Sequence, residues 1–254
     1  EGRDTRQWLR WMYDEAVRGI QAQGVTMPDF DTFWRQGGVA HPENPQPVVL
    51  LADFRADPVA HPLKTPSGRI ELFSERIAGF GYPDCPGHPT WFEPAEWLGA
   101  EAARRHPLHL ISDQPYTKLH SQLDHSAYSR ANKVAGREPV LLHPDDAAAR
   151  GIRDGDVVRV FNDRGSCLAG ARLSDGLRPG VAKLSTGAWW DSEAPGEVAA
   201  TDRHGNPNAL TRDAGASRLS QGCTAQTCLV QIERHAGELP AVRVFDPPAF
   251  APRP

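Results

Sequence analysis

Six short apolar runs in the second part of the chain constrain its fold most strongly. They read LHLIS, PVLLH, VVRVF, CLAGARL, VAKLS and CLVQIE, and all six follow His106. Each run is rich in Val, Leu and Ile, and turn-forming residues separate it from the next, a pattern typical of strands. Strands this short bury a core only together, so the pattern predicts a barrel or a sandwich.

Turn and cap signals lie between these runs. One helix is expected where His143 can act as the N-cap, Pro144 stands in the first turn and Gly151 ends an alanine-rich body. Residues 163–165 (DRG) and 177–180 (LRPG) are each expected to form a hairpin turn. The second part of the chain is therefore predicted to be mixed α/β, and mainly β.

The first part of the chain is predicted to be helical near its start. An amphipathic helix is expected over residues 4–18, and its apolar face carries Trp8, Trp11 and Met12. A second, shorter helix is expected over residues 29–36. Aromatic side chains of this size need a large partner surface, so we expect other structure to cover the face.

Pro and Gly are frequent over residues 37–66, and this composition is typical of loops. Two strands are predicted near this stretch, over residues 48–54 and 69–73. We therefore expect residues 1–104 to be a loop-rich helical segment and residues 105–254 to form the β domain.

The charge balance excludes two classes of partner. The chain has 28 Lys and Arg against 32 Asp and Glu, a net charge of −4, which is too mild to indicate binding to nucleic acid or to a membrane surface. The longest apolar stretch, residues 48–52, is far shorter than a bilayer span, so no membrane span is expected. The chain begins with Glu1 rather than Met, which a processed protein or the tail of a longer one would both explain.

The densest polar stretch follows the first strand, over residues 112–129 (SDQPYTKLHSQLDHSAYS). A loop that leaves a strand end with so many donors and acceptors suits phosphate, ribose and purine edges. A solvated loop with capping residues is the alternative. His120 and His125 are five residues apart and lack thiolate or carboxylate ligands at metal spacing, so they are interpreted as solvated or capping residues.

Other polar features are weaker. Residues 205–211 (GNPNALT) read as a turn in which the Asn208 amide can donate and accept. Cys223 and Cys228 flank Gln226, and they are interpreted as small residues that pack near a strand start. The sequence has no CxxC, no phosphate-binding glycine loop and no nucleophile motif, so neither a metal ligand nor a catalytic residue is assigned.

Taken in order, four segments resemble one family. They are HPLHLISDQPYTKLHSQLDHS, EPVLLHPDDAAARGIRDGDVVRVFNDRG, LRPGVAKLSTGAWWD and GNPNALTRDAGASRLSQGCTAQTCLVQIE. They resemble the C-terminal cofactor-binding region of the dimethyl sulfoxide reductase family of molybdenum enzymes. Upstream, FDTFWRQGG, FRADPVAHPLKTPSGRIELFSE and GHPTWFEPAEWLG look most like its biotin sulfoxide reductase and trimethylamine-N-oxide reductase members.

The resemblance implies that residues 105–254 form a six-stranded double-psi β-barrel, a molybdopterin dinucleotide-binding domain that clamps molybdenum bis(molybdopterin guanine dinucleotide). It implies that residues 1–104 are the C-terminal remnant of the upstream catalytic domains. It implies these cofactor-binding residues: Ser112, Asp113, Gln114, Pro115, Lys118, His120, Ser121, Gln122, Asn208 and Gln226. Lys118 stands where the family often has Arg. Because the sequence has no acidic residue between Asp113 and Asp124, we expect Lys118 to act on the cofactor as a free point charge.

The resemblance also implies a function for the complete enzyme, which is reduction of S-oxides or N-oxides by oxygen-atom transfer. The family's protein ligand to molybdenum, a Ser in this branch, would lie upstream of this chain, so we expect the chain alone to be inactive. Expected partners are the upstream domains of the same polypeptide, the oxide substrate and an electron donor protein. The sequence leaves open the physiological substrate and a cytoplasmic or periplasmic location. The alternative is a double-psi barrel that serves as an interaction module and binds no molybdenum cofactor.

Overall fold

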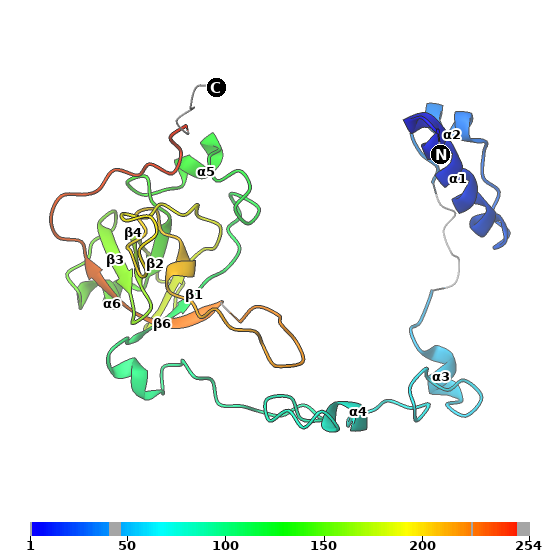
Figure 1. Cartoon of the computed structure of the whole chain (residues 1–254), viewed down its shortest axis with the longest axis horizontal. Helices are drawn as coiled ribbons and strands as arrows, with labels where there is room; N and C mark the ends of the chain where they lie inside the picture. The colour runs from blue at the N-terminus through cyan, green and yellow to red at the C-terminus, as the bar shows by residue number, and fades with distance from the viewer. Residues whose placement is uncertain (1, 41–46, 225, 248–254) are drawn as a thin grey trace. The chain divides into compact units, whose positions relative to one another are not determined.

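The structure is a computed structural model that describes residues 2–40, 47–224 and 226–247. It divides into two compact units, residues 1–71 and residues 72–254 (Figure 1). Each unit is described by itself below.

The first unit begins with the two helices that the sequence predicts. Helix α1 (Thr5–Gln21) starts at the N-cap Asp4, and helix α2 (Phe30–Gln36) starts at the N-cap Asp29. Phe30 is the buried contact between them, and only 2% of its surface is exposed. On the predicted apolar face of α1, Trp11 and Met12 remain 43% and 58% exposed.

The two strands predicted near this region are wrong. Residues 48–51 form a turn that leads into helix α3 (Ala52–Ala56), and residues 69–73 are irregular. A strand needs a partner to satisfy its backbone donors and acceptors. The strands of the second unit pair with one another in a closed β-barrel, and a closed barrel leaves no free edge for a further strand.

The second unit opens with two short helical elements, α4 (Glu75–Ala78) and the 3-10 helix η1 (Glu101–Arg104). All six predicted strands follow, and they are β1 (Leu108–Ile111), β2 (Pro139–Leu142), β3 (Val157–Phe161), β4 (Ser166–Leu173), β5 (Val181–Leu184) and β6 (Thr227–Arg234). They close into a barrel in the order β1-β5-β2-β4-β3-β6. The pairs β1/β5 and β2/β4 are parallel and the others antiparallel, and the barrel is of the expected double-psi type.

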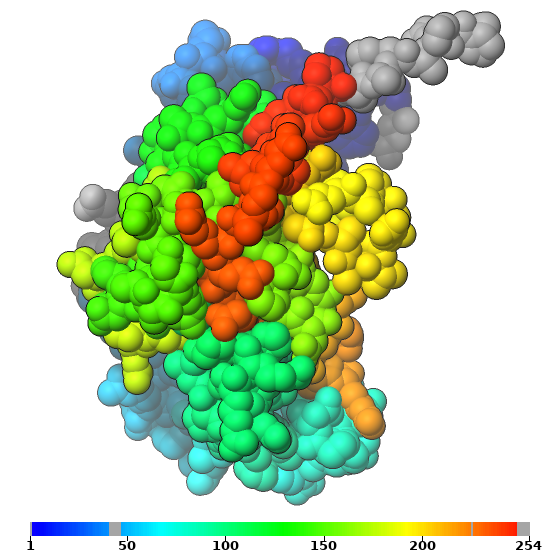
Figure 2. Space-filling view, turned by 90° about the vertical axis from the view of Figure 1, so that its left-hand side faces the viewer, coloured from blue at the N-terminus to red at the C-terminus, as the bar shows by residue number. Residues whose placement is uncertain are grey.

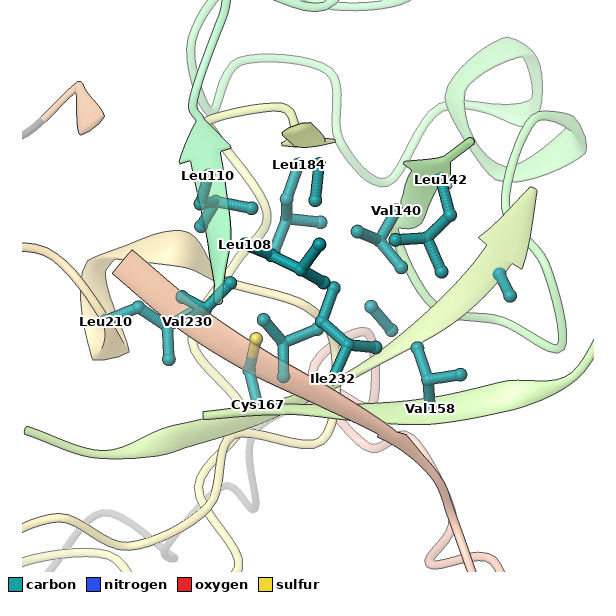
Figure 3. Packing of buried hydrophobic residues seen from close by; sticks show 14 of the residues in the cluster. Leu108, Leu110, Val140, Leu142, Val158, Cys167, Leu184, Leu210, Val230 and Ile232 are labelled. Atoms are coloured by element: carbon teal, nitrogen blue, oxygen red, sulfur yellow. The ribbon is translucent and has the colours of Figure 1, made fainter. Parts of the chain in front are cut away.

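The barrel interior is filled by every second residue of its strands, as the period of a strand requires. Leu108 and Leu110 of β1, together with Val140 and Leu142 of β2, are buried and point into the same cluster as Ile232 of β6 (Figure 3). β4 is buried along its first six residues, on both of its faces. Alternation along the strand therefore accounts for the buried residues of β1 and β2, whereas β4 is buried without alternation.

The connections confirm the predicted helix and one of the two predicted hairpins. Helix α6 (Pro144–Ala148) starts at His143, whose ring nitrogen accepts from the backbone N–H of Asp145. Residues 163–165 join the antiparallel strands β3 and β4. The prediction of a hairpin at residues 177–180 is wrong, because β4 and β5 are not neighbours in the barrel.

Two further helical elements and a C-terminal segment complete the unit. Helix α5 (Ala127–Ala131) and the 3-10 helix η2 (Pro207–Ala209) interrupt the connections. After β6, residues 235–247 run across the outside of the barrel unit, drawn in red across the green residues in Figure 2. The backbone N–H of Arg243 donates to the Asp191 carboxylate at 2.6 Å. This hydrogen bond anchors the C-terminal segment to Asp191.

Candidate functional site

The polar loop lies at one edge of the barrel because of the strand directions. β1 and β5 are parallel, so the loops that follow them, residues 112–126 and 185–190, leave from the same edge. β2 and β6 run antiparallel to these strands, which brings residues 138 and 226 to that edge as well. The backbone N–H of Ser112, for example, donates to the carbonyl of Gln226 at 2.8 Å.

A first cavity of about 300 Å³ opens at this edge. The polar loop, the region of α5, β2, β4 and β5 all contribute to its wall. Its lining residues are Asp113, Gln114, Pro115, Tyr116, Thr117, Ser129, Asn132, Lys133, Glu138, Pro139, Leu141, Arg172, Lys183 and Ser185. Amide, hydroxyl, carboxylate and cationic groups therefore share the cavity with apolar side chains.

Asp113 and Gln114 are held in place within this wall. The Asp113 carboxylate accepts from the Lys183 ammonium at 3.0 Å and from the Ser185 hydroxyl at 2.6 Å. The Gln114 side-chain nitrogen lies 3.2 Å from Nδ1 of His120. These contacts join the start of the polar loop to β5 and to the second cavity, which His120 lines.

The second cavity, of about 380 Å³, lies between the polar loop and the loop after β5. Its lining residues are His120, Ser121, Thr186, Gly187, Ala188, Trp189, Trp190, Asn206 and Asn208. The Trp189 indole N–H donates to the carbonyl of Ser121 at 2.7 Å, and the Asn206 amide donates to the carbonyl of Ala188 at 2.8 Å. Both walls of the cavity are thus fixed by hydrogen bonds.

A buried carboxylate shapes the segment that carries Asn206. Asp202 is fully buried and accepts backbone N–H bonds from Asp191, His204, Gly205 and Asn206. Burial raises the pKa of Asp202, and the four N–H donors oppose that rise without cancelling it. The carboxylate therefore orders a turn at the rim of the second cavity.

Lys118 does not carry the free charge that the sequence analysis expects. Its ammonium lies 3.1 Å from the Asp124 carboxylate and 2.8 Å from the Glu138 carboxylate, and its side chain is 0% exposed. Glu138 immediately precedes β2, outside the polar loop, so spacing along that loop could not reveal it. The expectation of an unneutralised lysine is wrong, because a buried ammonium needs partners.

The Asp124 carboxylate lies 3.8 Å from Nδ1 of His204, and both side chains are fully buried. Burial raises the pKa of Asp124, but the Lys133 hydrogen bond, the Trp189 N–H and the charges of Lys133 and Lys118 outweigh it, so the pKa is lowered overall. Burial, and then the charge of Lys133, lower the pKa of His204. His204 is therefore neutral near pH 7, with Nδ1 at 2.9 Å from the carbonyl of Trp189.

The structure brings most of the predicted residues together. Asp113, Gln114 and Pro115 line the first cavity, and His120, Ser121 and Asn208 line the second. Ser112, Gln122 and Gln226 lie at the same barrel edge but are not part of either wall, and Lys118 is buried beneath the loop. Whether these residues bind a cofactor stays a prediction.

Several residues of the site were missed in the sequence analysis. Arg172 and Lys183 line the first cavity from β4 and β5, and Trp189 lines the second. For Lys183 a signal existed, because in VAKLS it alternates with the buried residues Ala182 and Leu184. Arg172 and Trp189 carried no comparable signal.

The cysteines and histidines of the described residues form no metal centre. Over residues 2–40, 47–224 and 226–247, no cluster of three His, Cys, Asp or Glu side chains could hold a metal ion. Cys167 and Cys228 are buried in the barrel core and form no disulfide. Burial raises the pKa of Cys228 to about 12, so this thiol stays protonated.

Comparison with known proteins identifies the class of domain. Residues 108–229, which span β1 to the start of β6, match the family model described as "Molydopterin dinucleotide binding domain". The cavities described above lie at the edge of this domain. The match confirms the family expected from the sequence and supports a molybdopterin cofactor for the domain.

Over nearly its whole length the chain is similar to the C-terminal part of oxide reductases. It is 47% identical over 252 residues to the dimethyl sulfoxide/trimethylamine N-oxide reductase of Cereibacter sphaeroides, covering 99% of this chain and 30% of the relative. It is 51% identical over 248 residues to the biotin sulfoxide reductase of the same organism, covering 97% and 32%. The trimethylamine-N-oxide reductase of Salmonella typhi is 46% identical over 251 residues, covering 98% and 30%. The chain thus spans about a third of the length of these relatives.

The fold is found in a solved structure as well. Acetylene hydratase from Pelobacter acetylenicus matches 70% of this chain and 25% of its own with a TM-score of 0.56 and 21% sequence identity. At this identity the likeness concerns the fold. Separately, none of the helices in the described residues is long and apolar enough to cross a bilayer.

Proposed function

We propose that this chain is the C-terminal cofactor-binding part of a molybdenum oxidoreductase that reduces S-oxides or N-oxides. The observation that carries the proposal is the pair of polar cavities at one edge of a molydopterin dinucleotide binding domain. The cofactor is molybdenum bis(molybdopterin guanine dinucleotide). Residues 105–254 form its binding domain, and residues 1–104 belong with the upstream catalytic domains.

The chemistry of the lining groups supports this cofactor. A guanine dinucleotide has an anionic pyrophosphate and many donors and acceptors on its ribose, guanine and pterin. Lys183 and Arg172 offer positive charge in the first cavity. Asn206 and Asn208 offer amides in the second. The donor set therefore fits a large polar anion.

Each part of the proposed enzyme has a different task. The bound cofactor supplies the two-electron chemistry that takes an oxygen atom from the substrate. The residues of this chain bind and orient the cofactor through its polar groups, and they exclude water around it. The protein ligand to molybdenum comes from the upstream domains of the same polypeptide. An electron donor protein supplies the electrons.

The alternative, an interaction module without a cofactor, is not favoured. The family match covers the barrel itself, and the relatives that match nearly the whole chain are named as reductases. An interaction module would also have no need for cationic and amide groups gathered in two cavities.

The test uses the longer reading frame that contains these residues, which we refer to as the complete polypeptide. It is purified, and its molybdenum, molybdopterin and released guanine nucleotide are measured per chain. Turnover is then assayed with a reduced viologen dye and dimethyl sulfoxide, trimethylamine N-oxide or biotin sulfoxide. We expect one molybdenum with two guanine nucleotides, and oxide reduction. A complete polypeptide that binds no molybdopterin would overturn the proposal.

A further inference from the structure

Four buried charges form a closed ring beneath the polar loop, which we refer to as the charge quartet. Its members are Lys118, Asp124, Lys133 and Glu138. The Lys118 ammonium lies 3.1 Å from Asp124 and 2.8 Å from Glu138, and the Lys133 ammonium lies 2.8 Å and 2.7 Å from the same two carboxylates. All four side chains are between 0% and 5% exposed. The ring is balanced, with two positive and two negative charges.

Stability alone does not explain such a ring. Removing four charges from water is unfavourable, and well-packed apolar residues in their place are often equally stable or more so. What an ion-pair ring provides is geometry, because each group has two partners at fixed distances. Here the ring joins the polar loop, which carries Lys118 and Asp124, to two residues outside it. Lys133 follows helix α5, and Glu138 immediately precedes strand β2.

The quartet contacts the walls of both cavities. Lys133 and Glu138 line the first cavity directly. On the other side, Oδ2 of Asp124 accepts from the backbone N–H of Trp189 at 2.9 Å, and Trp189 lines the second cavity. A shift of the ring would therefore move a wall of each cavity.

The C-terminal segment covers this arrangement. The Phe245 ring lies 5.9 Å from the Lys133 ammonium, and it packs against Trp189 and His204 with ring centroids at 5.8 Å and 5.1 Å. This apolar cover keeps water away from the charge quartet. Exclusion of water strengthens the ion pairs of the quartet and restricts the positions that its charged groups can adopt.

We propose that the charge quartet is a positioning device that holds residues 113–122 against residues 186–190 and so fixes the two cavities relative to each other. The inference rests on the proposed function, in which both cavities hold parts of the cofactor. Lys118 and Asp124 act through the walls they hold and line neither cavity, so they are positioning residues.

The test removes half of the ring in the complete polypeptide. Lys118→Met combined with Asp124→Asn deletes one charge of each sign, preserves side-chain size and leaves the Lys133–Glu138 pair at 2.7 Å. The matched control is Arg159→Met with Glu233→Gln, which deletes an exposed ion pair between β3 and β6. Both double variants keep the net charge unchanged. Two readouts are taken, which are hydrogen exchange of the cofactor-free protein and molybdopterin content per purified chain.

We expect hydrogen exchange in residues 113–122 and 186–190 to become about tenfold faster in the quartet variant, which corresponds to about 1.4 kcal/mol of lost protection. Exchange in the barrel strands should stay as in the wild type, and molybdopterin content should fall about fivefold. The control variant should match the wild type in both readouts. Wild-type exchange in both loops, or faster exchange throughout the barrel, would overturn the positioning role.

Two further variants keep the outcomes distinct. If the quartet variant does not fold, Lys118→Met with Glu138→Gln leaves the Lys133–Asp124 pair, and faster exchange in residues 113–122 is again expected. Asn208→Ala alters the second cavity itself. Loss of cofactor in Asn208→Ala but not in the quartet variant would reject the positioning role alone, whereas full retention of cofactor in both would count against the proposed function too.

Discussion

A β-carbon on residue 187 would lie 1.8 Å from the carbonyl oxygen of His120, so Gly187 and His120 make a contact that only glycine allows. Gly187 also has a φ of +92°, which L side chains rarely adopt. We expect Gly187→Ala to push the loop after β5 away from the polar loop and to open the second cavity. The backbone strain alone should cost about 1–3 kcal/mol in the free energy of unfolding, and the clash should add to it.

Gly196→Ala is the matched control for this prediction. Gly196 has nearly the same φ, +91°, but nothing lies within 4 Å of its added β-carbon. Chemical unfolding of both variants separates strain from clash. Equal losses of stability in the two variants would show that the contact with His120 has no energetic weight.

Lys118→Met should destabilise the protein strongly, because it leaves Asp124 and Glu138 sharing one ammonium in a buried site. Breaking a buried pair by removing one partner costs about 3–5 kcal/mol. Since the site is shielded from solvent, the loss should be nearly independent of salt concentration, unlike the effect of a free loop lysine.

The comparison variant is Arg159→Met, which removes a cation that is 42% exposed. An exposed pair of this kind contributes about 0–1 kcal/mol and is screened by salt. Unfolding in denaturant at low and high ionic strength measures both variants. A small, salt-dependent loss for Lys118→Met would mean that its buried ion pairs do not form in solution.

The sequence predicts the barrel well because its information is local. Alternating apolar residues in runs such as VVRVF and VAKLS define each strand and its inward face without knowledge of its neighbours. Residues 48–54 carry the same local signal but have no partner strand, and they form a turn and a helix instead. Pairing is therefore the step that periodicity cannot provide.

The site shows the same division between local and distant information. The polar loop is recognisable from its composition, yet the partners that organise it are far away in sequence. Glu138 lies 20 residues from Lys118, and Trp189 lies 65 residues from Asp124. The parallel pairing of β1 with β5 and the antiparallel pairing of β2 with β5 bring these segments to one barrel edge.

Acid should weaken the protein partly through Asp124. The pKa of Asp124 is lower in the folded protein than in the unfolded chain, where it is near 4. The stability that the ionised carboxylate contributes is therefore fully present above the pKa of the unfolded chain. It is lost as the pH falls through the pKa of the folded protein. Asp124→Asn should therefore be less stable than the wild type at pH 7, and the difference should shrink below about pH 4. Thermal unfolding across this range measures it, with the exposed Asp213→Asn as the control. A difference that stays constant down to pH 2 would contradict the shift.

The 254-residue chain should show no oxide reductase activity by itself. It spans about a third of the relatives it matches, and we propose that the protein ligand to molybdenum lies in the remainder. The assay uses the purified chain, a reduced viologen dye and dimethyl sulfoxide, with the complete polypeptide as the positive control. Turnover that follows the molybdenum bound to the short chain would disprove this division of the active site.

Asn208→Ala and Gln122→Ala should reduce cofactor occupancy more than they reduce the stability of the cofactor-free protein. Both side chains are exposed at the barrel edge, so removing them should change the free energy of unfolding by no more than about 0.5 kcal/mol. Each substitution in the holoprotein leaves polar groups of the dinucleotide without a partner, at about 1–3 kcal/mol apiece.

Two measurements test this prediction, which are the molybdopterin content per complete polypeptide and the thermal unfolding of the apoprotein. The control is Gln23→Ala, which removes an exposed amide in the first unit. Because Asn208 lines the second cavity and Gln122 lines neither, the larger loss should come from Asn208→Ala. Wild-type molybdopterin content in both variants would show that these two amides do not bind the cofactor.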